Sequence, residues 1–316
     1  MTIIYEEIGQ RLRAYRLGSG LSADELAKKI GISRTALYKF EQGELAKIDT
    51  LEKLAELLGV SIPTLLGVGI EYIPSAVSYF ERLRQIEEAS EQIIMLSGPT
   101  SFLLSSDRFE NTLEEVLEEN ITGAVADPAR ARADVAKIME ILRLRKAHYQ
   151  KFRPAIVNLM SAFEIERFLD HGFVGHNGLP DDVRAKRRAL AHAEMQHFLG
   201  LIEQQPIGVQ IGIVPDTLPH LGFQLFRQQG RQLLVMSPFR LAGEPNVRVG
   251  VAMVTSAPDG VALHEEAVQE MWNRSLKGAA AADFLRHMLS SDRKPLDSEQ
   301  LTQWAIGSKP RKSRRA

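Results

Sequence analysis

The sequence has no cysteine, and this absence narrows the chemistry available to the protein. Without thiols the chain forms no disulfide, no thiolate metal site and no cysteine nucleophile, and it suits a reducing compartment. The sequence also lacks a basic leader followed by an apolar run, and any stretch of about 18 uncharged apolar residues, the length that crosses a bilayer. We therefore expect a cytoplasmic protein with no membrane partner.

Neither sign of charge is in excess. The chain carries 39 basic and 40 acidic residues, a formal net charge of −1, so composition alone does not indicate a nucleic-acid partner. Basic residues gather near the end, where residues 309–316 hold five positive charges and no negative one. We expect residues 291–316 to be a flexible basic tail.

The length of 316 residues and the pattern of apolar positions predict two domains. Residues 1–68 have apolar positions at helical spacing, divided by glycines and capping residues into five short helices, which favours an all-α domain. Residues 69–91 contain a predicted linker helix. Its apolar face must pack against the second domain or against the same helix of another subunit.

Residues 92–290 predict an α/β domain with a mixed sheet. Short apolar runs alternate with longer amphipathic stretches, and three closely spaced strand candidates follow, which should pair antiparallel. The predicted strands are 92–96, 155–160, 208–214, 222–227, 232–237 and 246–255, and the predicted helices are 109–119, 129–148, 162–170, 181–204, 262–275 and 279–289.

Two helices in the first domain are marked by strong local signals. Ser22 and Glu25 have the spacing of a capping box, in which the serine hydroxyl and the glutamate carboxylate each accept a backbone N–H. Gly31 supplies the left-handed conformation that a tight turn between helices requires. Ser33 caps the next helix, which ends at Gly43. The spacing predicts a helix, a short turn and a second helix.

The stretch from Leu21 to Gly43 resembles the XRE/Cro family of phage-repressor-like regulators, and the resemblance extends over residues 6–66. It implies a helix-turn-helix fold that binds double-stranded operator DNA and regulates transcription. At Ala23 the sequence departs from the family, which often has a glutamine there that supports DNA contacts. The resemblance is carried by the spacing of Leu26, Ala27, Gly31, Ser33, Leu37, Glu41 and Gly43.

The resemblance also implies which side chains meet DNA. In this family the start of the third helix faces the base edges in the major groove. Arg34 is the candidate for reading a base, because its planar guanidinium matches O6 and N7 of guanine. Nearby basic residues would contact phosphates, which position the protein without specifying sequence. The predicted DNA-binding residues are Ser22, Ser33, Arg34, Thr35, Tyr38 and Lys39, with Arg13, Lys28 and Lys47.

This predicted DNA-binding domain is electrically neutral. Residues 1–68 hold nine basic and nine acidic side chains. A single domain should therefore bind DNA weakly, because phosphate neutralisation supplies much of the affinity. We expect a homodimer that places two domains on two half-sites.

Residues 92–290 show no recognisable catalytic motif. His192 and His197 are five positions apart, about 140° around a helix, and cannot share one metal face. The sequence has neither a nucleophile elbow nor a Walker-type phosphate loop. We therefore expect no enzyme activity, no metal and no cofactor.

A small-molecule effector would contact this domain where strands run into polar turns. Ser101, Ser237, Arg240 and Thr255 lie at such positions. Arg240 would bind a carboxylate or phosphate through its guanidinium, and the competing interpretation is an ion pair with Glu244.

The leading hypothesis is a dimeric transcription regulator whose second domain binds a small molecule or a protein, with the linker helix transmitting the signal. Two alternatives stay open. One is an antitoxin-like repressor whose second domain only oligomerises, and the other is a residual hydrolase fused to a helix-turn-helix domain.

Overall fold

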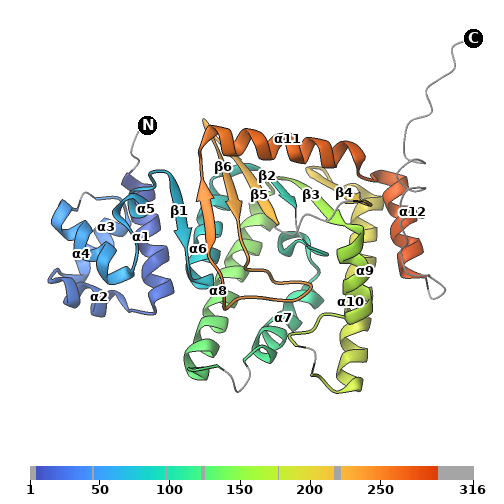
Figure 1. Ribbon diagram of the computed structural model, residues 1–316, viewed down its shortest axis with the longest axis horizontal. Helices are drawn as coiled ribbons and strands as arrows, with labels where there is room; N and C mark the ends of the chain where they lie inside the picture. The colour runs from blue at the N-terminus through green and yellow to red at the C-terminus, as the bar shows by residue number, and fades with distance from the viewer. Residues whose placement is uncertain are drawn as a thin grey trace, which may run out of the picture.

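The computed structural model describes residues 5–44, 46–96, 98–121, 125–176, 178–216 and 222–290. The expected basic tail and Ser97 therefore lie outside the described residues. Five short helices precede a larger body in which helices cover both faces of a mixed β-sheet (Figure 1). This arrangement confirms the predicted fold class, a helical region followed by an α/β region.

The N-terminal helices are those that the sequence predicts, because their ends are set by local signals. Helices α2 and α4 stop at glycines in the left-handed conformation, Gly31 with φ 76° and Gly59 with φ 67°. Their apolar positions meet in one core, where Leu26, Leu37 and Leu54 are fully buried. The five helices are α1 (Tyr5–Ser19), α2 (Ala23–Ile30), α3 (Arg34–Glu41), α4 (Ile48–Leu58) and α5 (Ile62–Leu66).

The described strands form one seven-stranded sheet with the order β1-β7-β6-β5-β2-β3-β4. Strands β2, β3 and β4 pair in parallel, and β5, β6 and β7 pair antiparallel, as their spacing predicts. The expected strand at 246–255 starts only at Ala252, because Asn246 pairs with Arg240 inside a loop. The strands are β1 (Ile70–Ile73), β2 (Ser90–Leu96), β3 (Ala155–Ser161), β4 (Val209–Val214), β5 (Phe223–Gln228), β6 (Arg231–Met236) and β7 (Ala252–Thr255).

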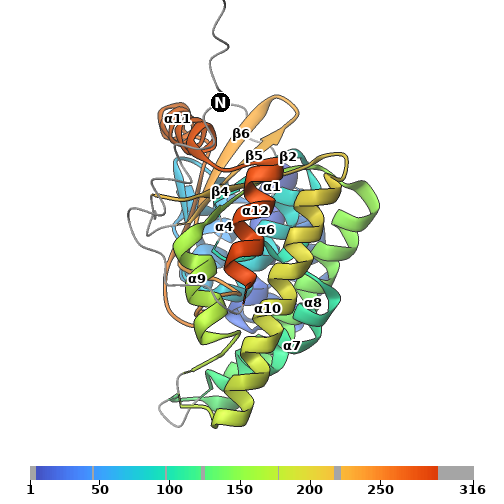
Figure 2. The ribbon, with the colours of Figure 1, turned by 90° about the vertical axis from the view of Figure 1, so that its right-hand side faces the viewer.

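Helices cover the two faces of the sheet unequally. Val261 and Val268 of α11 pack with Ile94 and Leu159 on one face. Helices α6, α8, α9 and α10 cover the opposite face (Figure 2). None of the described helices is long and apolar enough to cross a membrane. The helices of the body are α6 (Ala76–Glu88), the short η1 (Phe102–Leu104), α7 (Asp107–Glu119), α8 (Pro128–Phe152), α9 (Ala162–His171), α10 (Asp181–Gln204), α11 (Pro258–Arg274) and α12 (Gly278–Leu289).

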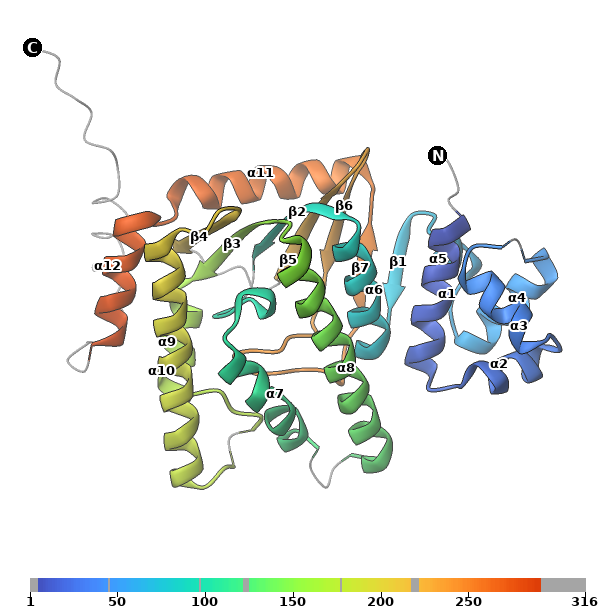
Figure 3. The same cartoon turned by 180° about the vertical axis from the view of Figure 1, so that it is seen from behind.

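The segment 69–91, expected as a linker helix, contains an edge strand followed by a helix. Strand β1 pairs antiparallel with β7, and its four residues carry too short a pattern to stand out in the sequence. Helix α6 is buried on most of its surface and packs between α1 and α8 (Figure 3). Its apolar face is therefore covered within the chain.

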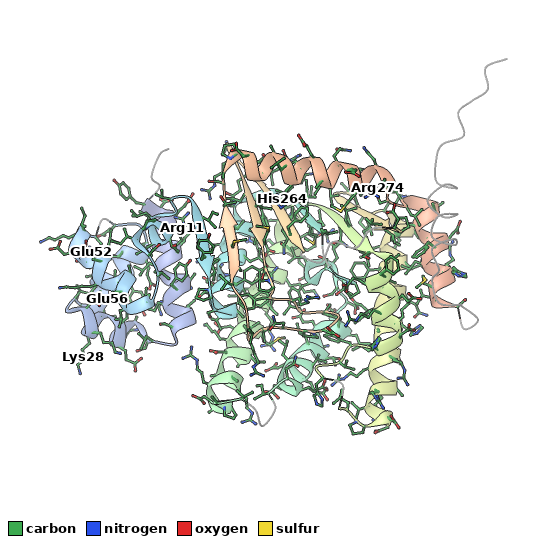
Figure 4. The ribbon with its side chains drawn as sticks, in the orientation of Figure 1. Arg11, Lys28, Glu52, Glu56, His264 and Arg274 are labelled. Atoms are coloured by element: carbon green, nitrogen blue, oxygen red, sulfur yellow. The ribbon has the colours of Figure 1, made fainter. Side chains whose placement is uncertain are left out.

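A buried cluster of charges joins the N-terminal helices to the sheet. Glu71 of β1 accepts hydrogen bonds from Arg82 Nε at 2.9 Å and from Arg11 Nε at 3.2 Å. The Tyr15 hydroxyl also donates to Glu71, at 3.2 Å. We call Arg11, Tyr15, Glu71 and Arg82 the junction cluster; Figure 4 labels Arg11, which lies where α1 meets the body. The cluster ties α1, β1 and α6 at one carboxylate.

The electrostatics of the cluster follow from its burial. Burial alone raises the pKa of Glu71, but the guanidiniums of Arg82 and Arg11 outweigh burial and hold that pKa below its ordinary value. Burial and the neighbouring carboxylate of Glu71 raise the pKa of Tyr15. Glu71 is therefore ionised in the folded protein, and its charge balances buried positive charge.

Replacing Glu71 should destabilise the fold strongly. In Glu71→Gln the buried guanidinium of Arg82 loses its ion-pair partner, while Arg11 keeps only Glu7. Breaking a buried pair in this way costs about 3–5 kcal/mol. Urea denaturation of the variant and the parent measures the difference in free energy of unfolding. Glu56→Gln, an exposed glutamate on α4, is the control and should stay within about 0.5 kcal/mol of the parent. Equal effects of the two substitutions would contradict a structural role for the cluster.

The contribution of Glu71 to stability should depend on pH. Its pKa is lower in the folded state than the ordinary value of 4.5, so its stabilisation is complete above that value and is lost as the pH falls through the folded pKa. Denaturation curves collected between about pH 3 and about pH 7 test this. Glu71→Gln should show a shallower loss of stability on acidification than the parent, and parallel curves would refute the prediction.

Candidate DNA-reading surface and ligand cavity

Helices α2 and α3 are fixed by the caps that the sequence predicts. Ser22 Oγ accepts a hydrogen bond from Glu25 N at 3.2 Å, and Glu25 Oε2 accepts one from Ser22 N at 2.8 Å. These bonds hold the pKa of the Glu25 carboxyl below its ordinary value. Ser33 caps α3 by accepting from Ala36 N at 3.1 Å. Both helices therefore begin at defined residues.

One face of α3 is exposed and polar. Leu37 is fully buried on the opposite face and anchors the helix. Ala23, where the related family often has a glutamine, is buried at the start of α2. Lys28 projects at the outer end of the helical region (Figure 4). The predicted DNA-binding residues that are exposed on α3 or next to it are Ser22, Lys28, Ser33, Arg34, Thr35, Tyr38, Lys39 and Lys47.

Arg13 is placed apart from this face. It lies on α1, and its Nε is 3.7 Å from Glu81 Oε1 of α6. Its nearest acidic partner therefore belongs to the body of the protein. The other basic residues that the sequence predicts to contact phosphates, Lys28, Lys39 and Lys47, are exposed on α2, on α3 and just before α4.

Arg34 already has partners within the chain. Its Nη1 donates to Asp24 Oδ2 at 3.2 Å, its Nη2 donates to the Tyr38 hydroxyl at 3.2 Å, and its guanidinium lies 5.4 Å from the centre of the Tyr38 ring. The hydrogen bond that Arg34 donates to the Tyr38 hydroxyl and the charge of Asp24 raise the pKa of Arg34. All three side chains are exposed, so the pair is screened by water and exchanges partners easily.

The exposed face of α3 points away from the sheet. Helix α1 contacts both α3 and α6 and stands between them (Figure 1). The end of α3 is tied to α1 by an ion pair in which Arg16 Nη2 donates to Glu41 Oε2 at 2.9 Å. The surface is therefore held rigidly while its outer side stays open to a partner.

A cavity of about 230 Å³ lies in the body, between α6, the loop before η1 and the loop after β6. It is lined by three of the four residues that the sequence singles out as effector contacts, Ser101, Ser237 and Arg240. We call it the α6 cavity. The fourth residue, Thr255, lines a separate cavity of about 590 Å³ beside the junction cluster.

The floor of the α6 cavity is aromatic. Tyr79 and Phe80 of α6 lie there with Phe102 and Phe239. Burial raises the pKa of the Tyr79 hydroxyl, although a hydrogen bond with Ser237 opposes the shift. The sequence does not signal these aromatic residues, because a buried ring in a helix has the same pattern whether it packs in a core or lines a cavity.

Two hydroxyls in the wall of the cavity have no hydrogen-bond partner among the described residues. Thr100 is 6% exposed and Ser161 is 2% exposed, and both line the cavity. A buried hydroxyl without a partner costs free energy, so native proteins pair most of them with protein or water. Ser161 was missed in the sequence because β3 runs from it directly into α9, with no polar turn between them.

Arg240 does not form the competing ion pair with Glu244, because Glu244 pairs with Arg167. The buried Arg145 in the cavity wall is paired with Glu87, with contacts of 2.7 and 2.8 Å. Arg240 has no ion-pair partner among the residues that the structure describes.

Two histidines of the body lie within hydrogen-bond distance of backbone carbonyl oxygens. His197 Nε2 lies 2.9 Å from the carbonyl oxygen of Leu104, and His264 Nδ1 lies 2.8 Å from that of Gly260. Within the described ranges no group of three or more histidine, aspartate or glutamate side chains is arranged to hold a metal ion.

Comparison with known proteins finds a family match in the helical region and relatives that are named as transcriptional regulators. The helix-turn-helix family model matches residues 12–65. The transcriptional regulator SinR of Bacillus subtilis is 41% identical over 61 residues, which are 19% of this chain and 55% of that protein. An HTH-type transcriptional regulatory protein of Methanocella arvoryzae is 25% identical over 166 residues, 41% of this chain and 51% of that protein. The chain thus spans about half the length of these relatives.

Among solved structures, TrmBL2, an archaeal chromatin protein, aligns over 85% of this chain and 93% of its own. Its TM-score of 0.29 and sequence identity of 12% are too low to carry an argument. The matched range contains the capped helices α2 and α3. Residues 12–65 are therefore a helix-turn-helix domain of the XRE type.

Proposed function

We propose that this protein is a transcription regulator that reads an operator in double-stranded DNA with α3. The observation that carries the proposal is the exposed polar face of α3, from Ser33 to Lys39, on a helix whose start and core are fixed. The major groove admits one α-helix, and Arg34 at the start of α3 is suited to guanine. Ser22, Lys28 and Lys47 border this face and would contact phosphates.

We infer that the working form is a homodimer. Residues 1–68 carry as many acidic as basic side chains, so one domain gains little from phosphate neutralisation. Two linked domains on half-sites about one helical turn apart raise the affinity without new contacts. Within each subunit, the contact of α1 with α6 would hold the reading helix in one orientation on the body.

The proposal includes an effector that binds in the α6 cavity. Tyr79, Phe80 and Leu83 of α6 line the cavity, while Arg82 and Gln85 of the same helix bond to β1 and α1. A ligand that shifts α6 would therefore also shift α1 and the helices packed on it. Allosteric coupling requires a structural element whose position both the effector and the DNA affect, and α6 together with α1 would be that element.

Removing Arg34 should abolish sequence preference and leave the fold intact. Loss of one bidentate contact to a base costs about 1–3 kcal/mol of discrimination. The test selects a binding sequence from random duplexes with the parent protein, then compares gel shifts on that sequence and on a scrambled one for Arg34→Ala.

Arg143→Ala is a matched control. Its side chain is 58% exposed, against 57% for Arg34, and it pairs with Glu114 of α7, outside the helix-turn-helix domain. The control should bind as the parent does. A preference that survives Arg34→Ala unchanged would overturn the assigned reading residue.

Removing the internal partner of Arg34 should strengthen DNA binding. Asp24→Asn keeps the shape of the side chain, frees the guanidinium and removes a negative charge that faces DNA phosphates. Exposed ion pairs are worth about 0.2–1 kcal/mol, so the affinity should rise by up to about fivefold at low salt and by less at high salt. Glu56→Gln removes the same charge on α4 and should have a smaller effect. Equal gains would show that net charge, and not release of Arg34, is responsible.

A further inference from the structure

Two side chains of opposite charge that line the α6 cavity have no ion-pair partner among the residues that the structure describes. Glu164 of α9 and Arg240 both line this cavity and also line a small adjoining cavity of about 20 Å³. Glu164 is half-buried and Arg240 is exposed. Among the residues that the structure describes, neither side chain has an ion pair or a side-chain hydrogen bond, and the two do not pair with each other. Both therefore remain available to a ligand at the opening.

Other charged side chains around the cavity do form ion pairs. At the same opening, Arg167 pairs with Glu244, and deeper in the wall Arg145 pairs with Glu87. The backbone at Arg240 is also held, because its N–H and C=O exchange hydrogen bonds with Asn246 at 3.0 and 2.9 Å. The position of Arg240 is thus fixed while its guanidinium stays free.

The space beside Glu164 is kept open by glycines. A Cβ atom at Gly243 would lie 3.6 Å from Glu164 Oε2, and one at Gly98 would lie 3.9 Å from it. No side chain from these two residues covers the carboxylate. A small group of a ligand can approach it from that side.

The opposite charges of Glu164 and Arg240 limit the kinds of ligand that the cavity can bind. A simple anion that pairs with Arg240 is repelled by Glu164, and a simple amine that pairs with Glu164 is repelled by Arg240. A molecule that carries both a carboxylate and an ammonium group satisfies both side chains. The unpartnered hydroxyls of Thr100 and Ser161 supply further hydrogen bonds inside, and the aromatic floor accepts an apolar body.

We propose that the α6 cavity binds a small zwitterion with an apolar body, the chemistry of an α-amino acid with a large apolar side chain. Its carboxylate pairs with Arg240, its ammonium group pairs with Glu164, and its side chain lies against Tyr79 and Phe102. The volume of about 230 Å³ is enough for one such molecule. This inference rests on the proposed effector role of the cavity.

The test uses the full-length protein and isothermal titration calorimetry with three matched probes. L-Phenylalanine carries both charges, 3-phenylpropionate lacks the ammonium group and 2-phenylethylamine lacks the carboxylate. L-Leucine and L-tryptophan are also titrated, because they carry both charges and have apolar side chains of different size. At least one of the three amino acids should bind, and removal of either charged group should weaken binding at least tenfold.

Variants assign each charge to its residue. Glu164→Gln should weaken the amino acid at least tenfold and leave 3-phenylpropionate unchanged or bound more tightly, because the repulsion is gone. Arg240→Gln should weaken the amino acid and leave 2-phenylethylamine unchanged or tighter. Thr255→Ala, which alters the other cavity, is the control and should bind as the parent does. Unfolding alone would weaken all probes together and cannot produce these opposite changes.

Two results would overturn the inference. One is binding of 3-phenylpropionate as tight as that of the amino acid, and the other is no heat and no thermal stabilisation with any of the three amino acids. Neither result touches the DNA-reading proposal, which fails separately if Arg34→Ala keeps its sequence preference.

Discussion

The structure depends on one buried carboxylate. Glu71 lies on the edge strand of the sheet and meets a guanidinium from α1 and another from α6, so three elements from different parts of the chain converge on a single charge. None of these groups tolerates burial alone, because each charge removed from water needs its partner. The orientation of the helix-turn-helix domain on the body is therefore fixed by neutralisation of buried charges, and apolar packing of α6 completes it.

The sequence predicts most of the helical region because the information there is local. A capping box spans four residues, and a glycine that ends a helix acts on its own turn, so Ser22, Glu25 and Gly31 could be interpreted without knowing the rest of the fold. The junction cluster could not be predicted. Arg11 and Glu71 are 60 positions apart, and on its own a buried arginine on an amphipathic helix has the pattern of a solvated one.

Three of the four residues that the sequence suggests as effector contacts line the α6 cavity. Ser101, Ser237 and Arg240 sit where strands or apolar runs give way to polar turns, and the strand order brings these turns to the same edge of the sheet. Thr255 also lies at the end of a strand before a polar turn. Because β7 is next to the edge strand β1, Thr255 lines the other cavity. The sequence does not predict a ligand contact at Glu164, because a glutamate on an amphipathic helix usually faces solvent.

The contact of α1 with α6 limits how far the two halves of the chain can be treated as interchangeable modules. At Gly18 a Cβ atom would lie 1.8 Å from the hydroxyl oxygen of Ser78, so the two helices touch closely. A chimera that joins a foreign helix-turn-helix domain at residue 68 would leave Glu71 and Arg82 without Arg11, and would bring a different first helix against α6. Successful exchange of DNA specificity in this scaffold therefore requires grafting the exposed residues of α3 onto the native α1, instead of replacing the domain as a whole.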